Sequence, residues 1–76
     1  MIERNHPLNS IIVFEVEDEI FEKYYSKTGV FAQRETVLYL GEIENMKGHI
    51  AVVKRNGKVM WGYHPYNFRP ATEDEI

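Results

Sequence analysis

The sequence predicts a small, mainly β domain, a barrel of five or six strands with one short helix after the first strand. Two observations indicate that the domain is mainly β. Runs of β-branched and aromatic residues alternate with glycine- and asparagine-containing turns, and a strong hairpin signal lies in the C-terminal half. The chain has 76 residues, of which 43% are hydrophobic. That amount of apolar material suits a single core with a thin margin of stability.

Two segments are the strongest candidates for strands in the N-terminal half. Residues 10–16 are rich in β-branched and aromatic side chains, and we expect a strand partly buried on both faces. Residues 36–43 form the second, with Val37, Tyr39 and Ile43 on one face and Leu38 and Leu40 on the other. Gly41 within that strand indicates a bulge or a bend. Residues 30–32 are a candidate for a further short strand.

Residues 18–27 connect these strands and have a helical pattern. Apolar side chains recur there at helical spacing: Ile20, Phe21, Tyr24 and Tyr25. Asp18 could cap the start of the helix, and Gly29 could end it. The alternative is a long, irregular hairpin arm.

The clearest local signal is a β-hairpin over residues 49–63. Its two β-rich runs flank Asn56-Gly57, the pair best suited to the positive φ angles of a two-residue type I′ turn. With that loop, Val52 faces Trp61 and Ile50 faces Tyr63, and His49 faces His64. One face of the hairpin then holds Ile50, Val52, Val59, Trp61 and Tyr63, and the other holds Ala51, Val53, Met60 and Gly62.

These elements predict three regions along the chain. We expect a flexible N-terminal arm over residues 1–9, a small β-barrel domain over 10–71 and an acidic tail over 72–76. The apolar run from Ile11 to Phe14 is too short for a signal peptide or a membrane span. We therefore expect a cytoplasmic protein that does not act at a membrane.

The last third of the chain resembles a known family. The stretch from Gly62 to Phe68, Gly-Tyr-His-Pro-Tyr-Asn-Phe, is similar to the Gly-Tyr-x-Pro-x-Asn-Tyr stretch that closes Src homology 3 domains. The resemblance implies a long strand, a short 3₁₀ turn and a final strand over 68–71 that closes a small barrel. It also implies that Pro65 and Phe68 match the residues lining the family's polyproline groove, with Asn67 beside them.

This sequence departs from the family at other positions. Ile50 stands where the family has a ligand-stacking tryptophan, Phe68 lacks the hydroxyl of the family's tyrosine, and no Ala-Leu-Tyr-Asp-Tyr segment lies upstream. Polyproline recognition needs an aromatic groove with hydrogen-bonding tips. We therefore expect the fold of the family rather than its ligand.

A second resemblance concerns the sequences of residues 37–43, 48–49 and 61–64. These segments are similar to small uncharacterised proteins encoded by bacteriophages and prophages. The resemblance implies a small accessory or host-modulating protein that binds a host or phage partner.

The aromatic residues near the C-terminus are the leading candidates for function. We predict a non-enzymatic module that binds a protein partner through Tyr63, His64, Pro65, Tyr66, Phe68 and Arg69, because tyrosine and arginine are enriched in interface anchors. In the competing interpretation Trp61 and Phe68 belong to the core, since a small barrel needs large side chains. A purely structural homo-oligomer is a further alternative.

Single-stranded nucleic-acid binding is the main alternative function. Lys54, Arg55, Lys58 and Arg69 would contact phosphates, and Trp61, Tyr63 or Tyr66 would stack on bases. The formal net charge of -3 argues against this interpretation.

The sequence contains no motif that indicates an enzyme or a cofactor. There is no cysteine, no glycine-rich phosphate loop and no elbow motif around a serine. Zinc binding would have to use His6, His49 and His64, of which the last two are predicted neighbours across the hairpin. Isolated surface histidines are far commoner, so we predict no metal site, no cofactor and no catalytic residue.

Overall fold

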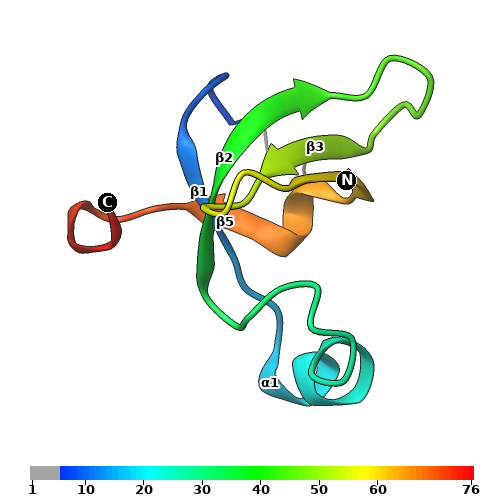
Figure 1. Ribbon diagram of the computed structural model, residues 1–76, viewed down its shortest axis with the longest axis vertical. Helices are drawn as coiled ribbons and strands as arrows, with labels where there is room; N and C mark the ends of the chain where they lie inside the picture. The colour runs from blue at the N-terminus through cyan, green and yellow to red at the C-terminus, as the bar shows by residue number, and fades with distance from the viewer. Residues whose placement is uncertain (1–5) are drawn as a thin grey trace.

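The computed structural model describes residues 6–76 and contains one antiparallel sheet (Figure 1). Its strands are β1 (Ile11–Phe14), β2 (Glu35–Glu42), β3 (Ile50–Val53), β4 (Val59–Tyr63) and β5 (Phe68–Pro70). Their order across the sheet is β4-β3-β2-β1-β5. The prediction of a mainly β domain is confirmed.

Helical turns occupy two of the connections between strands and the segment after β5. α1 (Asp18–Ile20) continues directly into the π-helical turn η1 (Phe21–Tyr25), and this segment lies beyond the end of β1, at one end of the molecule (Figure 1). A 3₁₀ turn, η2 (Pro65–Asn67), precedes β5, and another, η3 (Glu73–Glu75), follows it. The helix expected over residues 18–27 is therefore present, although it is shorter than expected. Residues 30–32 form no strand.

The sheet is open, whereas the sequence led us to expect a closed barrel. Within residues 6–76, β4 and β5 are the two edge strands and do not pair with each other. Closure would require these edges to exchange backbone hydrogen bonds. β5 has only three residues, and its last residue, Pro70, has no N–H to donate.

The core lies on one face of the sheet and is centred on Phe14. Its ring stacks on Phe31 at 4.7 Å between centroids and meets Phe68 and Tyr25 edge to face at 5.4 and 5.0 Å. The buried cluster consists of Ile12, Phe14, Phe31, Val37, Tyr39, Ile50, Val52 and Phe68. Phe31, which lies between η1 and β2, covers the sheet from the side that the helical segment occupies.

Gly41 forms the irregularity that the sequence predicts within residues 36–43. Tyr39 pairs with Val52 and Gly41 pairs with Ala51, so the register of β2 and β3 shifts between them. Leu40 is the extra residue. Gly41 has a φ of 121°, which side chains disfavour, and this explains why a glycine occupies the bulge.

The hairpin between β3 and β4 is present, but the prediction of a two-residue type I′ turn is wrong. A type I′ turn needs positive φ at both central residues, and here Gly57 has a φ of 89° while Asn56 does not have a positive φ. Gly57 N–H donates to the Lys54 carbonyl, and Lys54 N–H donates to the Lys58 carbonyl, both at 2.9 Å. These bonds close a three-residue loop with a glycine bulge, the next most common hairpin connection.

The longer loop moves the register of β4 against β3 by one residue. The side chains in the first part of β4 therefore lie on the opposite face from the one predicted. Val52 pairs with Met60 rather than Trp61, and Val53 pairs with Val59. A slip of one residue sends side chains to the opposite face. A second bulge, at Gly62, restores the predicted pairing of Ile50 with Tyr63. Met60 and Tyr63 therefore pack against the core.

Trp61 lies on the opposite face of β4 and is 64% exposed. The interpretation of Trp61 as a core residue is wrong, because the shifted register pairs it with Ala51 rather than Val52. Phe68, the other residue in that interpretation, is fully buried, so its assignment to the core is confirmed.

The terminal segments contact the sheet where the structure describes them. Of the expected arm over residues 1–9, the first five fall outside the described residues; His6 is buried, with its ring edge-on to Tyr39 at 5.6 Å. Asn9 N–H donates to the Tyr39 carbonyl at 2.9 Å. In the acidic segment over 72–76, Thr72 and Glu75 form a reciprocal capping box that starts η3. No helix within residues 6–76 is long and apolar enough to cross a membrane.

Candidate interaction surface

A group of aromatic side chains gathers where β3 begins and β4 ends. The His49 and His64 rings lie 4.5 Å apart, and the His64 ring stacks on Tyr66 at 4.9 Å with an interplanar angle of 11°. Tyr66 is 57% exposed. Met46 and Trp61 are also exposed, and His49 and His64 are partly exposed. We call the set Met46, His49, Trp61, His64 and Tyr66 the aromatic surface.

Local backbone structure positions these side chains. Pro65 is well suited to start the 3₁₀ turn η2, and Asn67 N–H donates to the His64 carbonyl at 3.1 Å. This turn folds Tyr66 back onto His64. On the other side, the turn between β2 and β3 is held by His49 N–H donating to the Met46 carbonyl at 2.9 Å.

Met46 completes the surface through the glycine bulge of β4. Its Cε lies 3.7 Å from the position that a β-carbon on Gly62 would occupy, so Met46 lies over this glycine. Trp61 is the residue before Gly62 in the same strand. Sequence reasoning predicted the neighbours His49 and His64 but missed Met46, because no local pattern indicated how the turn over residues 43–49 would fold.

Two of the predicted partner-binding residues contact the core instead. Phe68 is fully buried, so its assignment to a contact surface is wrong: its ring fills the core between Phe14 and Phe31. Tyr63 is partly buried and meets Phe31 edge to face at 5.0 Å. Burial, with a smaller effect from Tyr25, raises the pKa of Tyr63.

Arg69, the last predicted partner-binding residue, is held by two carboxylates. It donates from Nε to Glu15 at 2.7 Å and from both terminal nitrogens to Glu75 at 2.7 and 2.8 Å. Hydrogen bonding to Glu75 and then to Glu15 raises the pKa of Arg69. The guanidinium therefore joins β5 to the segment after β1 and to η3, and its charge is balanced within the molecule.

We expect this network to make stability depend on pH. Hydrogen bonds from Arg69 and from Thr72 N–H lower the pKa of Glu75 from 4.5 to about 2. A carboxyl whose pKa is lower in the folded state stabilises it above the unfolded pKa, and this contribution disappears as pH falls toward the folded pKa. In thermal melts, Glu75→Gln should lower the melting temperature at pH 6, and this difference should shrink between pH 4.5 and 2.

Asp74→Asn is the matched control, since Asp74 lies in the same turn and makes no ion pair within residues 6–76. Its melting temperature should follow that of the wild type at each pH. A Glu75→Gln deficit of the same size at pH 6 and pH 2 would contradict the ion-pair explanation.

The cations of the hairpin tip are only partly free. Lys54 Nζ donates to the Val30 carbonyl at 2.5 Å and lies 3.5 Å from a Glu35 oxygen. Arg55 Nε donates to the Thr36 hydroxyl at 2.9 Å. In the described part of the chain, Arg55 and Lys58 pair with no carboxylate. Of the four cations proposed for phosphate contacts, only these two keep an unbalanced charge.

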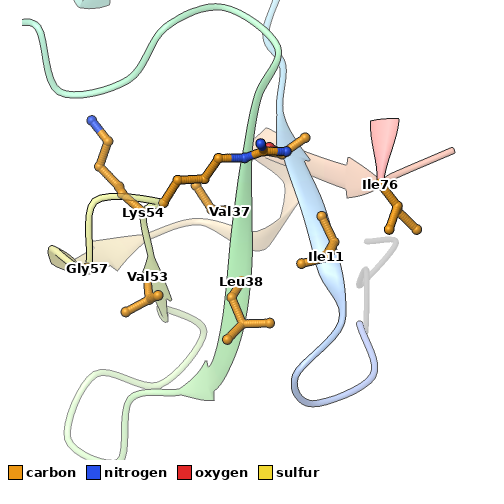
Figure 2. A pocket seen from close by; sticks show the side chains of 9 residues that line it. Ile11, Val37, Leu38, Val53, Lys54, Gly57 and Ile76 are labelled. Carbon is orange, nitrogen blue, oxygen red and sulfur yellow. The ribbon is translucent and has the colours of Figure 1, made fainter. Parts of the chain in front are cut away.

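A shallow apolar depression lies on the sheet face opposite the core (Figure 2). Ile11, Leu38 and Val53 line it from three adjacent strands, in the row that the pairings Ile11–Leu38 and Leu38–Val53 define. Arg55 borders it. The depression has a mainly apolar floor, and the polar side chains of its lining, Thr36, Lys54 and Arg55, are engaged in contacts within the protein.

The three histidines do not come together. His6 packs against Tyr39, whereas His49 lies against His64, which stacks on Tyr66. Residues 6–76 include no group of three or more His, Asp or Glu side chains that could hold a metal ion. The zinc alternative therefore lacks a third ligand in this part of the chain.

Comparisons of the chain with protein-family models, with curated proteins and with solved structures gave no match.

Proposed function

We propose that this protein is a non-enzymatic interaction module of the Src homology 3-like class that binds a protein partner through the aromatic surface. The observation that supports the proposal most is the exposure of Trp61 and of Tyr66, whose ring stacks on His64. The chain has ten Phe, Tyr and Trp residues, and Tyr24 is the other one with a largely exposed ring. It lies on the helical segment, apart from the aromatic surface.

Exposed aromatic side chains become favourable when a partner covers them. Tryptophan, tyrosine and methionine are enriched at the buried centres of interfaces, and Trp and Tyr dominate the binding energy there. A tyrosine already stacked on a histidine also loses little side-chain entropy when a partner binds. The aromatic surface combines both properties.

The proposed class is supported by the order of elements in the chain. A long connection that contains α1 and η1 separates β1 from β2, and a tight hairpin joins β3 to β4. A 3₁₀ turn precedes β5, and β5 pairs with β1. The stretch from Gly62 to Phe68 provides the end of that hairpin, the turn and the start of the last strand. A small accessory protein that modulates a host or phage partner would fit such a module.

A protein partner fits this surface better than a nucleic acid. Among the candidate phosphate contacts, the charges of Lys54 and Arg69 are balanced by Glu35, Glu15 and Glu75. Affinity for nucleic acid depends on free cations that displace counterions from phosphates. The aromatic surface needs no such cations to bind an apolar or aromatic protein segment.

The proposal is tested by affinity capture from the native cell with matched variants. Trp61→Ser combined with Tyr66→Ser should reduce capture of the specific partner more than tenfold, because interface anchors of this kind contribute about 2 kcal/mol or more each. Substitutions of exposed residues usually change the free energy of unfolding by no more than about 0.5 kcal/mol each, so the double variant should stay folded.

Tyr24→Ser is the control. The exposed fraction of Tyr24, 60%, is similar to that of Tyr66, but Tyr24 belongs to the helical segment. It should capture the partner as the wild type does. If the double variant captures the partner normally, or if Tyr24→Ser loses it, the site assignment is wrong.

A further inference from the structure

β4 is an edge strand that lacks protecting charges and prolines. It forms one end of the sheet, and its five residues, Val-Met-Trp-Gly-Tyr, include no charged residue and no proline. Edge strands are normally guarded by such residues because their free backbone groups attract other strands. The opposite edge, β5, is short and ends in Pro70.

The hairpin bonds determine which backbone groups of β4 are free. Lys54 N–H donates to the Lys58 carbonyl, so this pair is hydrogen-bonded. Hydrogen-bonded and non-hydrogen-bonded pairs alternate along an antiparallel ladder. The pairs Val53–Val59 and Ala51–Trp61 are therefore non-hydrogen-bonded, and the N–H and C=O groups of Val59 and Trp61 point away from β3.

These outward groups lie between exposed side chains. Val59 and Trp61 are 37% and 64% exposed, and neither backbone has a hydrogen-bond partner outside the ladder within residues 6–76. The Gly62 bulge ends the regular part of the edge. The usable edge thus offers up to four backbone hydrogen bonds at two residues, with Trp61 beside them.

The size and charge of this edge indicate its occupant. A stable dimer interface buries about 800 Å² per subunit, more than a two-residue edge can supply, whereas a short extended peptide needs little more than such an edge and an adjacent pocket. At the start of β4, Lys58 and Arg55 have no carboxylate partner in the described chain. A peptide with a carboxylate at that end would complement them.

We propose that the partner binds as an extended peptide that adds an antiparallel strand to β4. The peptide residues opposite Val59 and Trp61 exchange backbone hydrogen bonds with them and place apolar side chains against Trp61. An Asp or Glu at the end of the peptide lies near Lys58. This inference rests on the proposed function, because Trp61 belongs to both sites.

The test begins with a random linear peptide library selected against the whole protein. The selected sequences should alternate apolar and polar residues and carry a carboxylate at their C-terminal end, which antiparallel pairing places beside Lys58. Methylation of single backbone nitrogens in the tightest peptide should weaken binding about three- to tenfold or more at the residues opposite Val59 and Trp61. Methylation at the intervening residues should leave affinity unchanged, since their N–H groups point to solvent.

A pair of protein variants tests the same bonds from the other side. Val59→Pro removes the outward N–H, at a position where an edge strand tolerates proline. Val59→Ala removes most of the side chain but keeps the N–H. Val59→Pro should bind the peptide at least threefold more weakly than Val59→Ala. If Val59→Pro fails to fold, the methylation series on the wild-type protein decides the question.

The outcomes separate this inference from the proposed function. Binding that needs Trp61 and Tyr66 but ignores backbone methylation and Val59→Pro would overturn strand addition and leave the aromatic surface as the site. A library that yields no binder would also overturn it. So would a concentration-dependent dimer, lost in Val59→Pro, with no peptide binding, because a second copy would then occupy the edge.

Discussion

Replacing Phe14 by alanine should remove a large part of the protein's free energy of unfolding. The side chain is fully buried and contacts three other aromatic rings, Tyr25, Phe31 and Phe68. Removing such a side chain costs about 3–5 kcal/mol through lost burial and the cavity that remains. At about 0.05–0.15 kcal/mol per residue, a chain of this length has a total free energy of unfolding of roughly 4–11 kcal/mol.

Denaturant titration followed by circular dichroism measures this loss. Tyr24→Ala is the control, because it also truncates an aromatic ring but at an exposed site, and it should change the free energy of unfolding by within about 0.5 kcal/mol. A loss below about 1 kcal/mol for Phe14→Ala would mean that the core is not centred on this ring.

Gly41→Ala should give the second largest loss of stability. The φ of 121° at Gly41 is outside the regions that a residue with a β-carbon adopts readily, and such strain costs of order 1–3 kcal/mol. An added β-carbon would also lie 3.1 Å from Leu8 Cδ2, but Leu8 is exposed and can move aside. The backbone conformation therefore determines the cost.

Gly48→Ala provides the comparison for this prediction. Gly48 has a φ of 82°, closer to the left-handed region, and nothing lies within 4 Å of an added β-carbon. Its substitution should cost about 1–2 kcal/mol, less than that of Gly41. The same denaturant titration ranks the two variants. If Gly48→Ala is the more damaging of the two, the bulge between β2 and β3 does not depend on the conformation of Gly41.

The sequence predicted the features that depend on neighbouring residues. Alternation in residues 36–43 identified the buried face of β2, and Gly41 marked its bulge. The Asn56-Gly57 pair marked a hairpin. In each case the periodicity or the special φ angle of a glycine is a local property, which a single sequence records.

The features that failed or were missed depend on distant contacts or on small energy differences. Two-residue and three-residue loops both suit Asn56-Gly57, and the choice between them moved Trp61 from one face of β4 to the other. Whether β4 and β5 would meet to close a barrel depends on the curvature of the whole sheet. Phe31 had no periodic pattern around it, and its place in the core follows from how the chain returns after η1.

The candidate site was predicted in part for the same reasons. The stretch from Tyr63 to Tyr66 follows from the hairpin and the Pro65 turn, and its neighbour His49 follows from the pairing of Ile50 with Tyr63. Arg69 was expected to be available to a partner, but Glu15 and Glu75 hold it. These two carboxylates are 54 and 6 residues away in sequence, and no local rule brings the first of them to Arg69.

Fluorescence of Trp61, the single tryptophan of the chain, tests most directly whether the aromatic surface receives the partner. Acrylamide should quench this fluorescence readily in the free protein, because the indole is 64% exposed. After a tryptophan-free segment of the partner binds, we expect the emission to shift to shorter wavelength and the quenching to fall. Quenching that stays the same in the saturated complex would contradict the account, since Trp61 would then lie outside the interface.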